Sequence, residues 1–259
     1  MKQDIINFLK LIESENNVEI IFASDIGSRS IGYFTEKSDY DIRFIYIQKP
    51  QNYLKIKESK ENIQKKIGNY DFLGFDFKKT LEFISNSNVQ IWQCFYSKKI
   101  YLKTKTSEII EEKLKYFFNT KAILHQYLGL INNTYNKQIQ KKTEKVKIKH
   151  YLLILVRLSV ALYIAKNKEY PFEETIEFAL ENLPNEIIEN LKELLLFRKI
   201  QNIEEISKNK LIDNFINLKI NEIKEKADKT LVNKKQIEIL NQLFYEIISK
   251  KIKKVGKWK

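Results

Sequence analysis

Two short apolar runs near the start of the chain constrain the fold more than any other feature of the sequence. VEIIFASDI at residues 18–26 and YDIRFIYI at residues 40–47 are rich in β-branched and aromatic residues and short enough to be buried strands. Gly27 and Ser28 end the first run, and a third strand-like run, IGNYDFLGF, surrounds Asp71. We therefore expect a small sheet, flanked by helices, in the N-terminal part of the chain.

The remainder of the chain has a different pattern. Only 6 Gly and 3 Pro occur in 259 residues, so there are few built-in turns and long helices are favoured. Apolar residues recur at helical spacing in segments 108–118, 122–135, 146–165, 172–182, 186–197, 211–227 and 236–252. We expect an α+β chain, with a mixed-sheet domain over residues 1–105 and an all-helical domain over residues 106–259.

The charge of the chain favours polyanionic partners. Its 46 Lys and Arg against 33 Asp and Glu give a formal net charge of +13, which attracts phosphate groups. Lysines are concentrated in residues 136–149 and 249–259, with six in each stretch. Such runs are more often solvated surfaces than binding sites, and a coding bias toward Lys, Ile and Asn gives the same balance. Charge alone therefore leaves nucleic-acid binding open.

The sequence favours a cytoplasmic protein with no membrane partner. Cys94 is the only cysteine, so an intramolecular disulfide and a cysteine metal cluster are both excluded. Two histidines are too few for a histidine-based metal site. The N-terminus is too polar for a secretory signal, and the longest apolar stretch, residues 151–165, contains Arg157 and is too short to span a bilayer.

The residues with the clearest chemistry lie between the first two apolar runs. Asp39 and Asp41 are two positions apart, and in a strand this spacing places both carboxylates on one face. Such a pair suits Mg²⁺ or Mn²⁺, which takes phosphate oxygens as further ligands. Gly27 allows close approach of a phosphate, and Ser28 adds a hydroxyl and an N–H at an expected helix start. Each half is weak alone, but together they indicate a metal- and phosphate-binding site.

The same segment resembles a known active-site signature. GSRSIGYFTEKSDYDIRFIYI is similar to the signature of the DNA polymerase β superfamily of nucleotidyltransferases, and most closely to the YcgL-type bacterial family, which includes RNA-ligase-associated enzymes. The family pattern is matched by Gly27, Ser28, Arg29, Gly32, Ser38, Asp39, Tyr40, Asp41, Ile42, Arg43, Phe44 and Tyr46. A second family block is matched by Asp71, Gly74, Asp76, Lys79 and Leu81, with Phe75 in place of Trp. Beyond these blocks the resemblance loosens, and Gln93 occupies the position of a family acid.

The resemblance implies a polymerase β-like palm that transfers a nucleoside monophosphate from an NTP to a hydroxyl and releases pyrophosphate. ATP is the expected donor, and RNA, with tRNA as one candidate, is the expected acceptor. Asp39 and Asp41 would hold Mg²⁺ or Mn²⁺, and a third carboxylate would complete the site. Asp71 and Asp76 compete for that third position. We favour Asp71, because an N-cap role already accounts for Asp76.

Three basic residues are further candidates for nucleotide binding. Arg29, Arg43 and Lys79 could each contact phosphate oxygens, although Arg43 could instead pair with an aspartate and Lys79 could be an exposed helix residue. Two other functions remain open. One is an enzyme that nucleotidylates a protein or a small molecule. The other is a non-catalytic nucleotide- or RNA-binding module, such as a toxin–antitoxin component.

Overall fold

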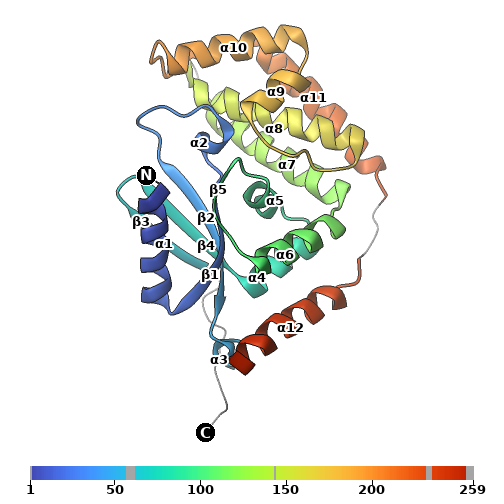
Figure 1. Ribbon diagram of the computed structural model, residues 1–259. Coiled ribbons are helices and arrows are strands. Elements are labelled where there is room, and N and C mark those ends of the chain that lie inside the picture. The colour runs from blue at the N-terminus through green and yellow to red at the C-terminus, as the bar shows by residue number, and fades with distance from the viewer. Residues whose placement is uncertain (1, 57–61, 143, 232–234, 255–259) are drawn as a thin grey trace.

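The computed structural model describes residues 2–56, 62–142, 144–231 and 235–254 of the chain (Figure 1). The elements of the N-terminal part are α1 (Lys2–Asn16), β1 (Val18–Asp25), α2 (Ser28–Ile31), β2 (Tyr40–Gln48), α3 (Pro50–Tyr53), β3 (Asn62–Ile67), β4 (Tyr70–Asp76), α4 (Phe77–Ser85), α5 (Val89–Phe95) and β5 (Lys99–Lys103). Those that follow are α6 (Lys105–Tyr116), α7 (Thr120–Tyr135), the π-helix η1 (Asn136–Gln140), β6 (Lys145–Lys147), α8 (Ile148–Asn167), α9 (Ile176–Asn182), α10 (Asn185–Lys199), β7 (Glu205–Ser207), α11 (Lys210–Lys229) and α12 (Glu238–Lys254).

The main sheet is mixed and has the strand order β3-β4-β2-β1-β5. β1 pairs antiparallel with β2 and β5, β3 pairs antiparallel with β4, and β2 and β4 run parallel. The central strand β2 is buried except at Asp41 and Arg43, which explains why the rest of it is mainly apolar and aromatic. The expected α+β class, with a mixed sheet and flanking helices, is confirmed.

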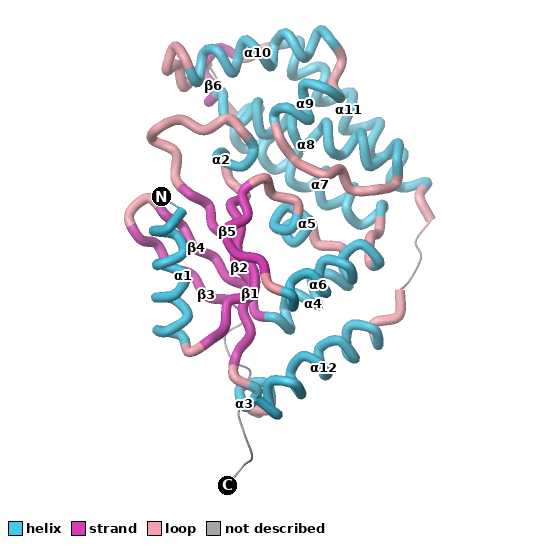
Figure 2. The backbone as a smooth tube through the Cα atoms, in the orientation of Figure 1, coloured by secondary structure: helices cyan, strands magenta, loops and turns pink. Residues whose placement is uncertain are grey.

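The two faces of this sheet are covered differently (Figures 1 and 2). On one face, α1 buries Ile5, Leu9 and Ile12, which recur at helical spacing and pack against the side chains of β2 and β4. The other face belongs to a larger core that continues without interruption into the helices from α4 to α12. We call the elements from α7 to α11 the helical part, which lies beyond one end of the sheet in Figure 1, whereas α6 lies alongside the sheet and contacts β1.

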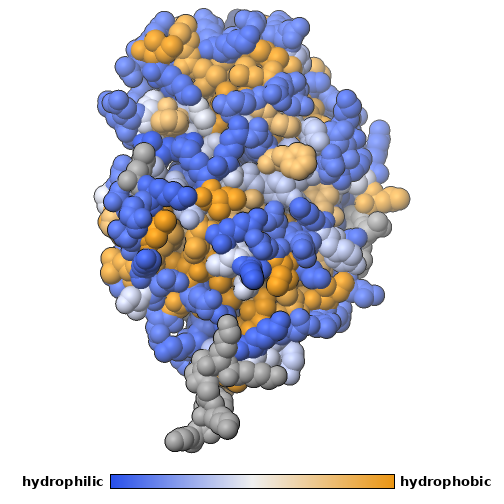
Figure 3. Space-filling view, viewed as in Figure 1, coloured by the Kyte–Doolittle hydropathy of each residue, from blue (hydrophilic) through white to orange (hydrophobic). Residues whose placement is uncertain are grey.

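The helix α8 forms the centre of the helical part. It is the one described helix that is long and apolar enough to cross a membrane, but 67% of its most apolar window is buried inside the protein. Burial of this kind is the pattern of a core helix. Most of the surface visible in Figure 3 is hydrophilic, with hydrophobic residues gathered in separate patches.

Some features of the helical part differ from the sequence-based expectation. A helix was expected from residue 146, but β6 pairs antiparallel with β7 in a small second sheet, and α8 begins at Ile148. Strands of three residues are too short to show a period of two, so no local pattern predicts them. The helix α12 packs back against α3 and α4 through Phe244, which contacts Tyr53 and Phe77. Residues 255–259 of the second lysine-rich stretch lie outside the described residues.

Candidate active site

The bend after β1 brings the Gly-Ser pair against the aspartates of β2. Ile26 N–H donates to the Asp41 carbonyl oxygen at 3.0 Å, which ties the bend to the second strand. A Cβ atom on Gly27 would lie 2.0 Å from Asp41 Oδ2 and 2.7 Å from Asp41 Cγ. The Asp41 carboxylate therefore occupies the space that any other residue at position 27 would need. Glycine is required here by close approach rather than by its backbone angles, since its φ of −85° is open to every residue.

Asp25 supports this bend from within the fold. It is fully buried, and its Oδ1 accepts a hydrogen bond from Gly27 N–H at 2.8 Å. Burial raises the pKa of the Asp25 carboxyl to about 6; the Gly27 hydrogen bond opposes the rise, and the nearby charge of Asp41 adds to it. The helix α2 begins at Ser28, as expected, but it spans only residues 28–31. Its dipole is therefore that of a single turn, and the Ser28 side chain is the other polar group at this position.

Three carboxylates lie at this end of the sheet. Asp39 directly precedes β2, Asp41 is its second residue, and Asp71 is directly opposite Asp41 in the parallel pairing of β2 with β4. The pKa of Asp41 is raised, first by burial and then by the charges of Asp71 and Asp39, while Arg43 and Lys149 oppose the rise. The pKa of Asp41 thus depends on both neighbouring carboxylates, although Asp71 itself is not part of the lining of the cavity in front of Asp39 and Asp41.

The donor set at this end of the sheet fits a magnesium ion. Asp39 and Asp41 offer oxygen ligands within one cavity, and Gly27 leaves room for the Asp41 carboxylate. Among the described residues, no three carboxylate, imidazole or thiol side chains converge on a single point. A pair of carboxylates with substrate oxygens as the remaining ligands is the usual arrangement for Mg²⁺, which seldom has an all-protein cage.

A cavity of about 470 Å³ opens in front of Asp39 and Asp41 and reaches from the sheet to the helical part. Its wall on the sheet side includes Gly27 and Ser28. The facing wall is mainly cationic: it carries Lys147, Lys149, Arg157 and Arg198, together with Leu153 and the acidic Glu204. The cavity therefore combines an acidic side, which could hold a cation, with a basic side, which could hold an anion.

The basic wall was largely missed in the sequence, although a signal was present. Lys149, Leu153 and Arg157 are spaced by four residues, so they share one face of α8. Arg157 Nη1 donates to Thr134 Oγ1 at 3.3 Å, while its buried Nε has no hydrogen-bond partner among the described residues. Arg198 is buried and donates from Nε to the Tyr33 carbonyl oxygen at 2.8 Å. Arg198 thereby joins α10 to the loop that precedes Asp39.

Arg29 and Arg43, both expected to contact phosphate, have protein partners in this structure. Arg29 donates from Nη2 and Nε to the Ser38 carbonyl oxygen at 2.8 and 3.2 Å, and its guanidinium lies 4.0 Å from the centre of the Tyr40 ring. It therefore fixes the loop that carries Asp39. Arg43 lines the cavity, and its Nη1 lies 3.8 Å from Asp71 Oδ2. This second contact matches the alternative ion pair with an aspartate.

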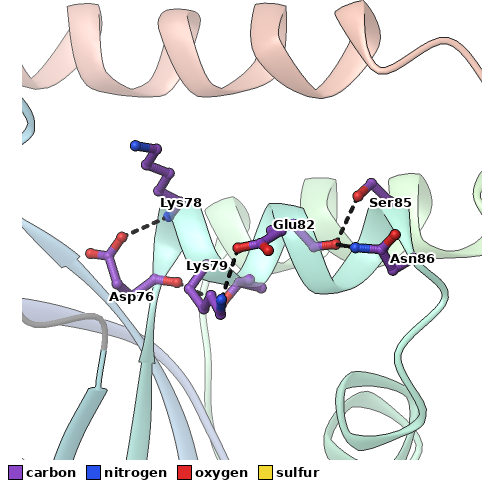
Figure 4. A network of polar contacts seen from close by, with 7 residues as sticks. Asp76, Lys78, Lys79, Glu82, Ser85 and Asn86 are labelled. Atoms are coloured by element: carbon purple, nitrogen blue, oxygen red, sulfur yellow. Dashed lines mark hydrogen bonds and ion pairs between the residues drawn. The ribbon is translucent and has the colours of Figure 1, made fainter.

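Asp76 and Lys79 lie at the opposite end of β4 from Asp71. Asp76 is opposite Tyr46, five residues further along the parallel pair than the Asp41–Asp71 position, or roughly 16 Å. Its carboxylate caps α4 by accepting from Lys78 N at 2.8 Å, and Lys79 pairs with Glu82 at 2.9 Å (Figure 4). The structure thus brings neither residue to the Asp39–Asp41 cavity. Asp76 and Lys79 are close to Asp71 in the sequence but far from it in space, because β4 is extended between them.

Gln93, at the position of the family acid, also lines the cavity. Its Nε2 donates to both oxygens of Glu174, at 3.1 and 2.9 Å, and the buried Glu174 also accepts from Tyr127 and Tyr170. A carboxylate from the loop between α8 and α9 is therefore held next to the residue that replaces the acid. This network could not be predicted from the sequence, because Gln93 and Tyr127 are far from Glu174 along the chain.

A mixed sheet that presents an aspartate pair to a Gly-Ser bend is the arrangement expected of DNA polymerase β-type nucleotidyltransferases. The profile of RlaP, the RNA repair pathway DNA polymerase beta family, matches residues 1–246, and the chain belongs to this family. It is also 29% identical over 254 residues to the uncharacterized protein YcgL of Bacillus subtilis (strain 168), covering 96% of each chain. The family resemblance expected from the sequence is confirmed, and membership supports a nucleotidyltransferase-like activity.

Proposed function

We propose that this protein is a metal-dependent nucleotidyltransferase that moves a nucleoside monophosphate from an NTP, with ATP as the expected donor, to a hydroxyl group of RNA. The observation that carries the proposal is the packing of the Asp41 carboxylate against Gly27, in a cavity shared with Asp39 and faced by cationic side chains. A triphosphate needs both kinds of group, because its oxygens must be neutralised and its reacting phosphorus must be held in place.

The residues of the cavity divide the work. Asp39 and Asp41 would hold Mg²⁺ or Mn²⁺, which supplies electrostatic stabilisation of the phosphate oxygens when bound. Lys149 and Arg157 face them across the cavity, where they can neutralise the charge of the leaving pyrophosphate. Asp71, beside Asp41 on the neighbouring strand, is positioned to orient the acceptor hydroxyl and take its proton.

The bond changes of the reaction follow from these positions. The acceptor oxygen forms a bond to the α-phosphorus as its proton passes to the Asp71 carboxylate. The bond from the α-phosphorus to the bridging oxygen breaks, and its electron pair leaves with pyrophosphate. Arg43 next to Asp71 keeps that carboxylate from turning away from the site.

The charge of the cavity favours a polyanionic acceptor over a cationic small molecule. Four cationic side chains line its wall on the helical side, and an aminoglycoside-like acceptor would be repelled by them. A purely non-catalytic binding module is disfavoured because Asp39, Asp41 and Asp71 are all retained at one end of the sheet. The buried, free Cys94 fits a cytoplasmic setting.

The deciding experiment is incubation with each labelled NTP, Mg²⁺ or Mn²⁺, and a mixture of total cellular RNA and protein. We expect metal-dependent release of pyrophosphate and label in the RNA fraction. Asp41→Asn is the matched inactive variant. Label in protein would replace the proposed acceptor with a polypeptide. NTP binding without pyrophosphate release under any condition would refute the enzyme and leave a binding module.

A further inference from the structure

A second cavity of about 490 Å³ adjoins the Asp39–Asp41 cavity and shares Lys147 and Lys149 with it. It is lined by Gln138, Lys142, Lys145, Lys147, Lys149, His150 and Glu205. We call it the lysine groove. Its wall is formed by η1 and the residues after it, by β6 and the start of α8, and by β7. Because two lysines belong to both cavities, the groove leads directly to the wall that faces the aspartates.

We propose that the lysine groove binds the phosphodiester backbone of the RNA acceptor, just upstream of the terminal nucleotide that enters the Asp39–Asp41 cavity. The inference rests on the proposed function for the identity of the acceptor. The inference extends the proposed function by describing the path that the acceptor strand takes over the protein surface. The occupant is one single-stranded polyanion.

The spacing of the lysines along β6 fits a phosphate backbone. Lys145 and Lys147 are exposed while Val146 between them is buried, so the strand alternation places both lysines on the solvent side. Residues two apart in a strand are roughly 6–7 Å apart. This distance is comparable to the separation of successive phosphates along an extended nucleic-acid strand. Lys149, the second residue of α8, is exposed as well and lines both the groove and the Asp39–Asp41 cavity.

These lysines also lack the ion pairs that occupy many other lysines of this chain. Across the described ranges, no carboxylate lies within ion-pairing distance of Lys142, Lys145, Lys147 or Lys149. By contrast, Lys192 pairs with Glu189 at 2.8 Å and Lys226 pairs with Glu222 at 2.7 Å on their own helices. The groove lysines therefore have a charge that a ligand can neutralise, with release of counterions.

The lowered pKa of His150 reflects the positive potential of the groove. Burial, and after it the charges of Lys149, Lys147, Lys142 and Arg198, together lower the pKa of its imidazole to about 4. The cationic groups of β6, α8 and α10 thus act on one point. The imidazole is therefore neutral near pH 7 and adds no charge to the groove. Glu205 is the single acidic residue of the lining.

The test uses the full-length chain with the double variant Lys142→Gln/Lys145→Gln, because these two residues line the groove and not the Asp39–Asp41 cavity. The matched control is Lys192→Gln/Lys226→Gln, which removes the same charge from paired surface positions. Binding of a fluorescein-labelled single-stranded RNA of about 20 nucleotides is followed by anisotropy, between about 50 and 200 mM salt. This readout requires no turnover, so it remains informative if nucleotide transfer fails.

We expect the groove variant to bind RNA about tenfold more weakly than the control, with a salt slope smaller by about 1.4, as two lost single-strand phosphate contacts predict. The KM for a long RNA acceptor should rise by a similar factor, while the KM for ATP stays unchanged. Equal RNA affinity in the two variants would overturn the groove, even if transfer to RNA is observed. Normal groove-dependent RNA binding without any transfer would instead refute the proposed function and leave the groove standing.

Discussion

Replacement of Gly27 by alanine should damage the chemistry of the site far more than the stability of the fold. The new Cβ would lie 2.0 Å from Asp41 Oδ2, whereas ordinary van der Waals contact begins at 3.4 Å. The carboxylate must therefore retreat by about 1.4 Å. Alanine readily adopts the observed φ of −85°, so position 27 itself is not strained. Asp41 Cβ would lie 2.8 Å from the new atom, however, so the bend and β2 must also separate by a few tenths of an ångström. The perturbation thus acts on one proposed metal ligand.

The size of the effect follows from that displacement. A misplacement of about 1 Å at a reacting centre costs on the order of 100-fold in rate, or about 2.7 kcal/mol of transition-state stabilisation. We expect kcat to fall by about this factor. The free energy of unfolding should fall by only about 1 kcal/mol, at the lower end for overpacking, because Asp41 borders an open cavity into which it can turn.

The assay combines pyrophosphate release from ATP with urea unfolding of the same preparation. Two glycines provide matched controls. A Cβ on Gly74 would lie 2.2 Å from Phe44 Cε2 in the core, so Gly74→Ala should cost about 1–3 kcal/mol of stability. Gly129 has open space within α7, and Gly129→Ala should stabilise by about 0.5–1 kcal/mol. A folded Gly27→Ala protein with wild-type turnover would refute the reasoning.

Four further substitutions test other parts of the molecule. Asp71→Asn should abolish transfer and leave the fold intact. Asp76→Asn should keep the helix cap but lower the free energy of unfolding by about 1–2 kcal/mol with turnover retained, because Tyr53 and Gln48 lose their shared carboxylate oxygen. The reverse result, by the same two assays, would exchange their roles. The folded-state pKa of His150 is about 4 against an ordinary 6.5, so its contribution to stability is complete above pH 6.5 and is lost as the pH falls toward 4. Urea unfolding at about pH 7 and about pH 5 should therefore differ more for wild type than for His150→Gln, and equal differences would contradict the shift. Glu174→Gln should cost about 1–3 kcal/mol in thermal unfolding, because buried hydroxyl donors lose a shared carboxylate, and an unchanged Tm would argue against the network.

The parts of the site that could be predicted from the sequence are local. Asp39 and Asp41 share a side because strand side chains alternate, and Gly27 lies near Asp41 because the strands on either side of the bend pair antiparallel. The position of Asp71 depends on the parallel pairing of β2 with β4, which links distant segments and has no local signal. Asp71 was preferred over Asp76 as the third carboxylate because the capping pattern already explained Asp76.

The basic wall shows where sequence reasoning reached its limit. The helical spacing of Lys149 and Arg157 was present in the sequence, but nothing local shows which way that face of α8 points. The direction is set by packing of the helical part on the sheet. Lys79 illustrates the opposite error, since its place in a family block suggested proximity to the site while β4 carries it to the far end.

The uninterrupted core has a consequence for engineering this protein. Ile21 and Phe22 of the central sheet belong to the same buried cluster as Leu155 of α8 and Ile216 of α11. Heating should therefore melt sheet and helices in a single cooperative transition. A chimera that takes its helices from a relative, in order to alter acceptor choice, would have to inherit the matching sheet face as well. Otherwise the aspartates and the cations would no longer be held at a fixed separation.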